Sequence, residues 1–277
     1  MDSLILWIIV FTALGGVLSV LAAATFLLLP ESSRTRMLSP MVSFAIGTLL
    51  GASFLAILPH AFETPGVDAH RVTLTVLCGI LAFFFLEKMV IWRHCHTHDC
   101  DVHGSTHIPK DQAQGASEVH IPDVERARDA AAGKLILIGD GIHNMVDGVL
   151  IAAAFLTDIH LGVITSIAVI AHEIPQELGD FAILLQSGYR RGRALLYNAL
   201  TGLTTIIGGV VAFFFLSLAN LLVPYVLAIA ASSFIYIAVA DLIPGLHKRP
   251  EFSATVQQMA LIGLGIFVIF ATHSTLH

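Results

Sequence analysis

The chain has 277 residues, of which 56% are hydrophobic and 12% are charged, with 14 Lys and Arg against 20 Asp and Glu. A soluble domain carries about 25% charged residues, so this composition, together with long apolar runs, indicates a polytopic membrane protein. No basic stripe interleaved with aromatic residues occurs in the sequence, which argues against a nucleic-acid partner.

Eight segments are long and apolar enough to cross a bilayer as helices, which takes about 20 residues each. The first lacks a basic leader and a small-residue cleavage site, so we expect a retained helix rather than a removed signal peptide. The fourth and fifth are the least apolar, and a simple hydropathy count could miss them. The sequence thus predicts one all-α transmembrane domain over residues 1–277. Its segments are 4–29, 40–62, 72–92, 134–156, 160–187, 194–218, 222–246 and 255–276.

The positions of Lys and Arg indicate how these helices are oriented. Cytoplasmic loops collect Lys and Arg, and here the even-numbered loops contain only Arg71. We therefore expect the odd loops inside, both termini extracytoplasmic, and a 3+2+3 arrangement in which two outer triplets flank a central pair. The basic residues in or beside the odd loops are Arg34, Arg36, Lys88, Arg93, Lys110, Arg126, Arg128, Lys134, Arg190, Arg191, Arg193, Lys248 and Arg249.

The third loop, residues 93–133, is rich in imidazole and thiol groups and is predicted to be cytoplasmic. Dense tracts of this kind bind metals loosely. We expect the loop to be disordered because Pro, Gly and polar residues fill the rest of it, although residues 123–132 could extend the fourth helix. A linker without a metal role is the alternative. The candidate loop ligands are His94, Cys95, His96, His98, Cys100, His103 and His107.

Two stretches place charged and imidazole groups inside the fourth and fifth segments. Carboxylates at mid-membrane are costly, so they are usually paired, turned into a polar cavity and functional. Residues four apart share a helix face, and the short connection at residues 157–160 makes the two helices antiparallel neighbours, so the two polar faces can meet. The predicted metal ligands are His143, Asn144, Asp147, His172, Glu173 and Gln176, and the predicted pathway carboxylates are Asp140, Glu177 and Asp180.

Imidazole and carboxylate ligands suit zinc, iron(II) or manganese, and the lack of thiolates argues against copper(I). A structural polar cluster and a metal-free proton relay are the alternatives. A zinc protease is another, because His-Glu-x-x-His on a helix marks that class. Here Gln176 stands in place of the second His and Pro175 interrupts the helix, so we expect no enzyme.

Further acidic and imidazole groups lie near the ends of the helices and could serve the same pathway. Those predicted to be outside could collect metal, although plain solvated side chains are the alternative. The outer groups are Glu63, Asp68, His70, Asp158, His160, His273 and His277, and further pathway candidates are His60 and Asp241.

Both motifs resemble those of the ZIP family of zinc and iron transporters. The fourth segment carries His143-Asn144-x-x-Asp147-Gly148, and the fifth is similar to His-Glu-x-Pro-His-Glu-x-Gly-Asp, with Gln176 in place of the second His of that pattern. The resemblance implies a transport position lined by His143, Asp147, His172 and Gln176, and a second position lined by Asn144, Asp147, Glu173 and Gln176. Many relatives carry an acid on the sixth helix, but residues 198–205 contain none, so we expect one occupied position.

The sequence therefore predicts a multi-pass transporter in the plasma or inner membrane that moves divalent metal into the cytoplasm. Zinc is the expected substrate, with iron(II), manganese and cadmium left open, and no organic cofactor is expected. The alternatives are a metal exporter and a membrane-embedded metal-dependent hydrolase. A homodimer is left open.

Overall fold

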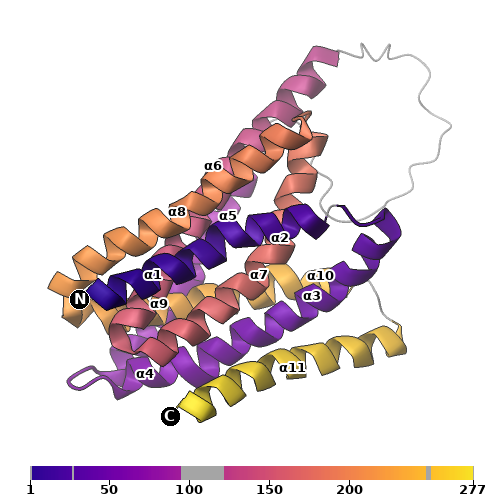
Figure 1. Ribbon diagram of the computed structural model, residues 1–277. Coiled ribbons are helices and arrows are strands. Elements are labelled where there is room, and N and C mark those ends of the chain that lie inside the picture. Colours follow the sequence, from indigo (N-terminus) through magenta and orange to yellow (C-terminus); the bar gives the residue numbers. More distant parts are fainter. Residues whose placement is uncertain (1, 27, 95–121, 248–250, 277) are drawn as a thin grey trace.

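The computed structural model describes residues 2–26, 28–94, 122–247 and 251–276, and all regular structure within these ranges is helical (Figure 1). The helices form eight long runs, three of which contain a short π-helical segment. In chain order the runs are α1 (Asp2–Ala13), η1 (Leu14–Leu18) and α2 (Ser19–Phe26); α3 (Glu31–Ala52), η2 (Ser53–Ile57) and α4 (Leu58–Glu63); α5 (Ala69–His94); α6 (Pro122–Thr157); α7 (Ile159–Gln186); α8 (Arg191–Leu218); η3 (Asn220–Leu222), α9 (Val223–Tyr236), η4 (Ile237–Leu242) and α10 (Ile243–Leu246); and α11 (Phe252–Leu276).

Within the described residues, seven of the eight runs are long and apolar enough to cross a membrane, judged by length and composition. The eighth is α7, which has 28 residues but carries the His, Glu, Gln and Asp side chains of the fifth predicted segment. The expectation that a hydropathy count could miss a motif helix is therefore confirmed. The seven spans are Ser3–Phe26, Arg36–Glu63, Ala69–Met89, Ile136–Thr157, Arg191–Leu218, Val223–Leu246 and Phe252–Ser274.

The first and last helices begin and finish at the same end of the bundle (Figure 1). A chain that starts and ends on one side crosses the bundle an even number of times. This arrangement agrees with α7 as an eighth crossing, lying between α6 and α8 in the chain.

Two helix boundaries differ from the sequence prediction. The second segment was expected from residue 40, but α3 begins at Glu31 and continues through Pro40, because a proline inside a helix removes one hydrogen bond without always ending the helix. The fourth helix begins at Pro122, a residue suited to the first helical position. The extension of the fourth helix through residues 123–132, considered from the sequence, is thus confirmed, and residues 95–121 lie outside the described residues.

Two close helix pairs flank the interior of the bundle, α6 with α8 and α3 with α11. Glycine permits both approaches. A Cβ atom at Gly148 would lie 1.9 Å from the backbone oxygen of Thr205, and one at Gly47 would lie 2.1 Å from the backbone oxygen of Ile262. Small residues of this kind let membrane helices pack backbone to backbone. α7 lies between the two pairs and packs against α6 and α3, so the motif helices α6 and α7 meet in the interior.

Three runs contain a π-helical turn, η1, η2 and η4. Such turns are wider than α-helical turns because each N–H bonds to a carbonyl five residues earlier, and they often occur at functional sites. In η2, the Ser53 hydroxyl donates to the Leu49 carbonyl at 2.9 Å and approaches the Ala231 carbonyl of α9 at 3.4 Å. The wide turn is thereby held against the neighbouring helix.

Candidate metal site

The connection between α6 and α7 sets the two motif faces against each other. Asp158 stands immediately before α7, and its Oδ1 accepts hydrogen bonds from the backbone N–H groups of His160 at 2.8 Å and Leu161 at 3.1 Å. A side chain that caps the first turn in this way fixes where a helix begins. Because only this residue separates α6 from α7, the two helices run antiparallel. Asp158, which the sequence analysis named among the groups that could collect metal, acts here as a helix cap.

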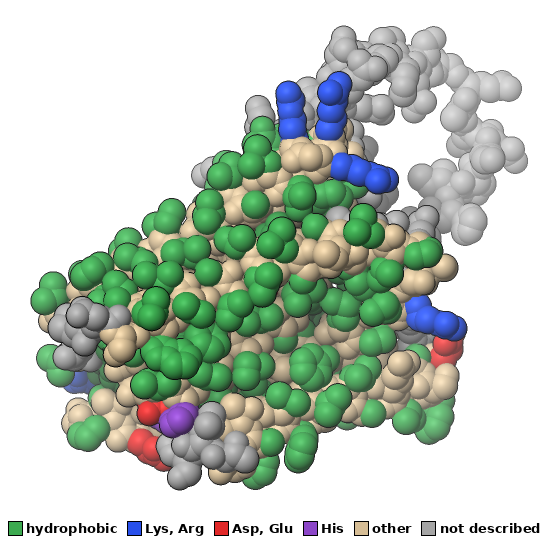
Figure 2. All heavy atoms as spheres, viewed as in Figure 1, with side chains coloured by type: hydrophobic (Ala, Val, Ile, Leu, Met, Phe, Trp, Pro, Cys, Tyr) green, Lys and Arg blue, Asp and Glu red, His purple; other side chains and the backbone are tan. Residues whose placement is uncertain are grey.

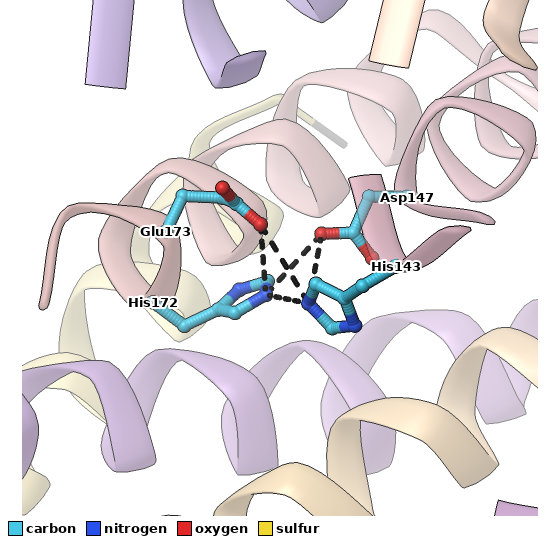
Figure 3. A group of neighbouring side chains, drawn as sticks. All are labelled: His143, Asp147, His172 and Glu173. Atoms are coloured by element: carbon cyan, nitrogen blue, oxygen red, sulfur yellow. Dashed lines mark hydrogen bonds and ion pairs between the residues drawn. The ribbon is translucent and has the colours of Figure 1, made fainter. Parts of the chain in front are cut away.

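Four side chains from α6 and α7 converge in the interior (Figure 3). His143 and Asp147 come from α6, and His172 and Glu173 come from α7. The Nε2 atom of His172 lies 3.2 Å from Asp147 Oδ2, 3.3 Å from His143 Nε2 and 3.7 Å from Glu173 Oε1. The Nε2 atom of His143 lies 3.6 Å from Glu173 Oε1 and 3.8 Å from Asp147 Oδ2. We call these four residues the four-donor site.

These separations match the requirements of a four-coordinate ion. Zinc binds His nitrogen and carboxylate oxygen at about 2.0–2.2 Å in tetrahedral sites, which places neighbouring ligand atoms about 3.3–3.5 Å apart. The N···O distances of 3.2–3.8 Å in the four-donor site lie around that value. A small contraction would therefore let one ion contact all four residues.

The hydrogen bond made by His172 identifies the nitrogen that carries its lone pair. Its Nδ1 lies 3.0 Å from the backbone carbonyl of Ala168, and because a carbonyl only accepts hydrogen bonds, Nδ1 carries the proton. In the neutral ring, the lone pair of Nε2 then lies among the other donors of the four-donor site, where a cation would bind it. Histidines that bind metals usually donate their other ring N–H to a carbonyl or carboxylate in this way.

The carboxylates of Asp147 and Glu173 are buried without the partners that such groups require. Both side chains are 0% exposed, and within the described part of the chain no donor hydrogen-bonds to either oxygen of either group. A buried charge without a partner is costly, whereas a divalent cation between the carboxylates would neutralise both. The His143 side chain is 23% exposed, whereas the other three side chains of the four-donor site are almost completely buried.

Asn144 lies beside the four-donor site and is held by protein groups. Its side-chain nitrogen donates to Asp140 Oδ1 at 2.9 Å, and its Oδ1 accepts a hydrogen bond from the Thr205 hydroxyl of α8 at 2.8 Å. The residue is fully buried. The structure therefore places this predicted ligand next to the four donors, with its amide engaged by α6 and α8.

The other predicted residues lie one or more turns from the four donors. Gln176 is half-buried on α7 and lies close to the Asp140 carboxylate. Glu177 is fully buried, and in the described structure neither of its oxygens has a hydrogen-bond partner. Asp180 is half-buried and Asp241, on η4, is exposed. His94 is the last residue of α5, and the remaining candidate loop ligands lie outside the described residues: Cys95, His96, His98, Cys100, His103 and His107.

Two contributions to the site were missed by reasoning from the sequence. Thr205 positions Asn144 from the sixth helix, and the Phe234 ring of α9 lies 6.0 Å from the ring of His172. The sixth helix offered a signal in Thr201, Thr204 and Thr205, hydroxyl residues at helical spacing in an apolar span. Phe234 offered none, since phenylalanine is common in apolar helices.

Comparison with known proteins gives a consistent result along the chain. The family model described as ZIP zinc transporter matches residues 2–273. Zinc transporter ZIP13 of Homo sapiens is 32% identical over 84% of this chain and 70% of its own length. Zinc transporter zipt-7.2 of Caenorhabditis elegans is 32% identical over 93% of the chain and 64% of its length, and zinc transporter ZIP5 of Homo sapiens is 33% identical over 93% and 56%.

The alignments cover between 56% and 70% of these three relatives, which are therefore longer than this chain. The resemblance inferred from the motifs is confirmed, and a family of transporters rather than enzymes favours transport over the hydrolase alternative. This chain belongs to the ZIP family of zinc transporters and is an integral, multi-pass membrane protein.

Proposed function

We propose that this protein moves divalent metal, with zinc as the first substrate, into the cytoplasm through the four-donor site between α6 and α7. The observation that carries the proposal is the meeting of two imidazole and two carboxylate groups, with their donor atoms all within 4.8 Å of one another, in the interior of the bundle. The relatives named as zinc transporters support zinc as the substrate.

The distribution of charge supports an orientation with the termini outside. Lys and Arg side chains project at the end of the molecule where α6 begins and α8 begins, whereas acidic and His side chains gather near the C-terminal end of α11 (Figure 2). The basic group includes Arg190, which stands immediately before α8, and Arg191 and Arg193 in the first turn of α8. Because basic loops stay in the cytoplasm, this end faces inward. Movement toward it is the direction that the motif resemblance implies.

In this orientation, the three pathway carboxylates lie on the inner side of the four-donor site. α6 starts at the cytoplasmic end, so Asp140 lies closer to the cytoplasm than His143 and follows it on the way in. α7 runs from outside to inside, so Glu177 and Asp180 follow His172 toward the cytoplasm. An ion released from the four donors would meet these carboxylates next.

The four donors would replace water around the ion as it arrives. Binding must be favourable enough to strip the hydration shell and weak enough to allow release. His and carboxylate ligands must also be deprotonated to bind metal, so protons compete for the same lone pairs. His143, the most exposed of the four donors, would be the first to contact an arriving ion.

Substitution of the two histidines tests the site. Uptake of radioactive zinc into vesicles should fall to background in His143→Ala and His172→Ala, because each change removes a donor from a four-coordinate ion. His160→Ala, at the first turn of α7, is the matched control and should transport normally. Parental uptake by both site variants, at equal amounts of folded protein, would remove the site from the proposal.

The direction of transport requires a separate measurement. Protein reconstituted in vesicles with its basic loops on one known side should move zinc toward those loops when the metal is supplied on the opposite side. Net movement away from the basic loops under the same gradients would identify an exporter.

A further inference from the structure

A second pair of histidines meets at the end of the bundle where the chain begins and ends. His60 lies on α4 and His273 near the end of α11, and their ring centroids are 5.8 Å apart. In the four-donor site, the rings of His143 and His172 are 5.5 Å apart. The two pairs therefore have nearly the same spacing, one that lets two imidazoles reach a common ion.

His60 is oriented by the same device as His172. Its Nδ1 lies 2.9 Å from the backbone carbonyl of Ala56, four residues earlier, as Nδ1 of His172 lies 3.0 Å from the carbonyl of Ala168. The carbonyl can only accept, so Nδ1 of His60 carries the proton and the lone pair resides on Nε2. This is the tautomer in which histidine binds transition metals through Nε2.

The helices that carry the pair are packed closely enough to hold it in place. α4 continues the run that begins with α3, and α3 is packed along α11. A Cβ at Gly265 would lie 2.5 Å from the backbone oxygen of Phe44, and one at Gly51 would lie 3.2 Å from Ile269. None of these helices contributes to the four-donor site, so the second pair is a separate, pre-formed arrangement.

The surroundings of the pair suit a hydrated cation. Both histidines are half-buried near the end of the bundle, and Glu63, one turn after His60, is exposed. Residues three apart on a helix lie on one side, so Glu63 shares the His60 side of α4. Figure 2 shows acidic and His side chains gathered in this region, near the C-terminal end of α11.

We infer that His60 and His273 form a second metal site, which binds a divalent transition ion such as zinc through two imidazoles, with water or Glu63 completing the coordination. Imidazole is the preferred ligand of zinc, copper and nickel among divalent ions. In the orientation proposed above, the site faces outside and holds metal before transport. That role rests on the proposed function, whereas the binding itself does not.

The test measures zinc bound per chain by equilibrium dialysis of the purified, full-length protein in detergent. His60→Ala and His273→Ala should each lower the zinc bound by one ion per chain, and the double variant should lose no more than either single variant, because both residues hold the same ion. His247→Ala, an exposed histidine immediately after α10, is the matched control and should bind as much as the parent.

A double variant of the four-donor site separates the two sites. The protein that carries both His143→Ala and His172→Ala should lose the interior ion and keep the outer one. Adding His273→Ala to this double variant should then remove the outer ion. Unchanged zinc content in His60→Ala and His273→Ala would show that the two rings make only an aromatic contact, and the inference would be wrong while the transport proposal stood. If His60→Ala does not fold, His273→Gln, near the end of α11, provides the same test.

Discussion

Thr205 donates its hydroxyl hydrogen to Asn144 Oδ1 at 2.8 Å and so connects α8 to α6 beside the four-donor site. Asn144 in turn donates to Asp140 Oδ1 at 2.9 Å. The chain of contacts fixes the amide between a neighbouring helix and a pathway carboxylate. Groups that orient the surroundings of a metal change its affinity by about 10–100-fold when they are removed.

Replacing Thr205 by Val should therefore weaken zinc transport without touching a zinc donor. The change leaves a buried amide oxygen without its donor, which should lower stability by about 1 kcal/mol and raise the KM for zinc by about 10-fold. Thermal unfolding in detergent and zinc uptake measure the two effects. Ser217→Ala, an exposed residue of α8 bonded only within its own helix, should change neither.

Gly148 should not tolerate a methyl group, although alanine is the better helix former. Its Cβ would fall 1.9 Å from the Thr205 backbone oxygen, so α6 and α8 would have to separate. Gly148→Ala should cost about 1–3 kcal/mol or more by overpacking and displace the four-donor site. Gly139→Ala on the same helix has nothing within 4 Å and should be neutral or stabilising. Equal melting temperatures for the two variants would contradict the close packing.

Glu173 and Glu177 are both buried on α7, but only Glu173 belongs to the four-donor site. Glu173→Gln should lower zinc affinity by more than about 10-fold, since even residues that only orient ligands have effects of about 10–100-fold. Glu177→Gln should slow transport with a smaller change in equilibrium zinc binding. Binding and uptake measured on the same preparations distinguish the two roles, and identical behaviour of both variants would contradict the distinction.

Replacing Gln176 by His tests whether this position reaches the ion. An imidazole is a stronger ligand for zinc than a neutral amide, so Gln176→His should lower the KM for zinc at least several-fold if the side chain turns toward the four donors. The KM for zinc uptake is the measurement. An unchanged KM, with normal expression, would show that the residue at position 176 contacts Asp140 and does not bind the metal.

The sequence predicted the candidate site best through residue types that seldom occur inside apolar helices. His143, Asp147 and His172 could be predicted to converge because His and carboxylates at helical spacing are rare inside apolar segments, and the short connection at Asp158 forces the helices to be neighbours. Gln176 was expected as the fourth member, but Glu173 stands there and Gln176 lies close to Asp140. α7 could be predicted as a crossing in spite of its polar residues because the alternation of basic loops requires it.

Contacts between distant segments could not be predicted in the same way. Gly139 and Gly148 look equivalent in the sequence, yet only Gly148 touches another backbone, because the packing partner is chosen by the whole bundle. The same holds for Thr205, whose hydroxyl could equally have bonded to its own helix. The meeting of His60 with His273 depends on how α4 and α11 are packed, and the two residues are more than two hundred positions apart in the chain.

The π-helical turns bear on how this chain is compared with its relatives. Each turn, at Leu14–Leu18, Ser53–Ile57 and Ile237–Leu242, holds an extra residue that a regular α-helix of the same rise would lack. Loss of one residue at such a place can be absorbed locally, so the side chains beyond it keep their faces. Single-residue insertions and deletions within these three spans are therefore compatible with an unchanged architecture, and an evolutionary alignment should allow gaps there.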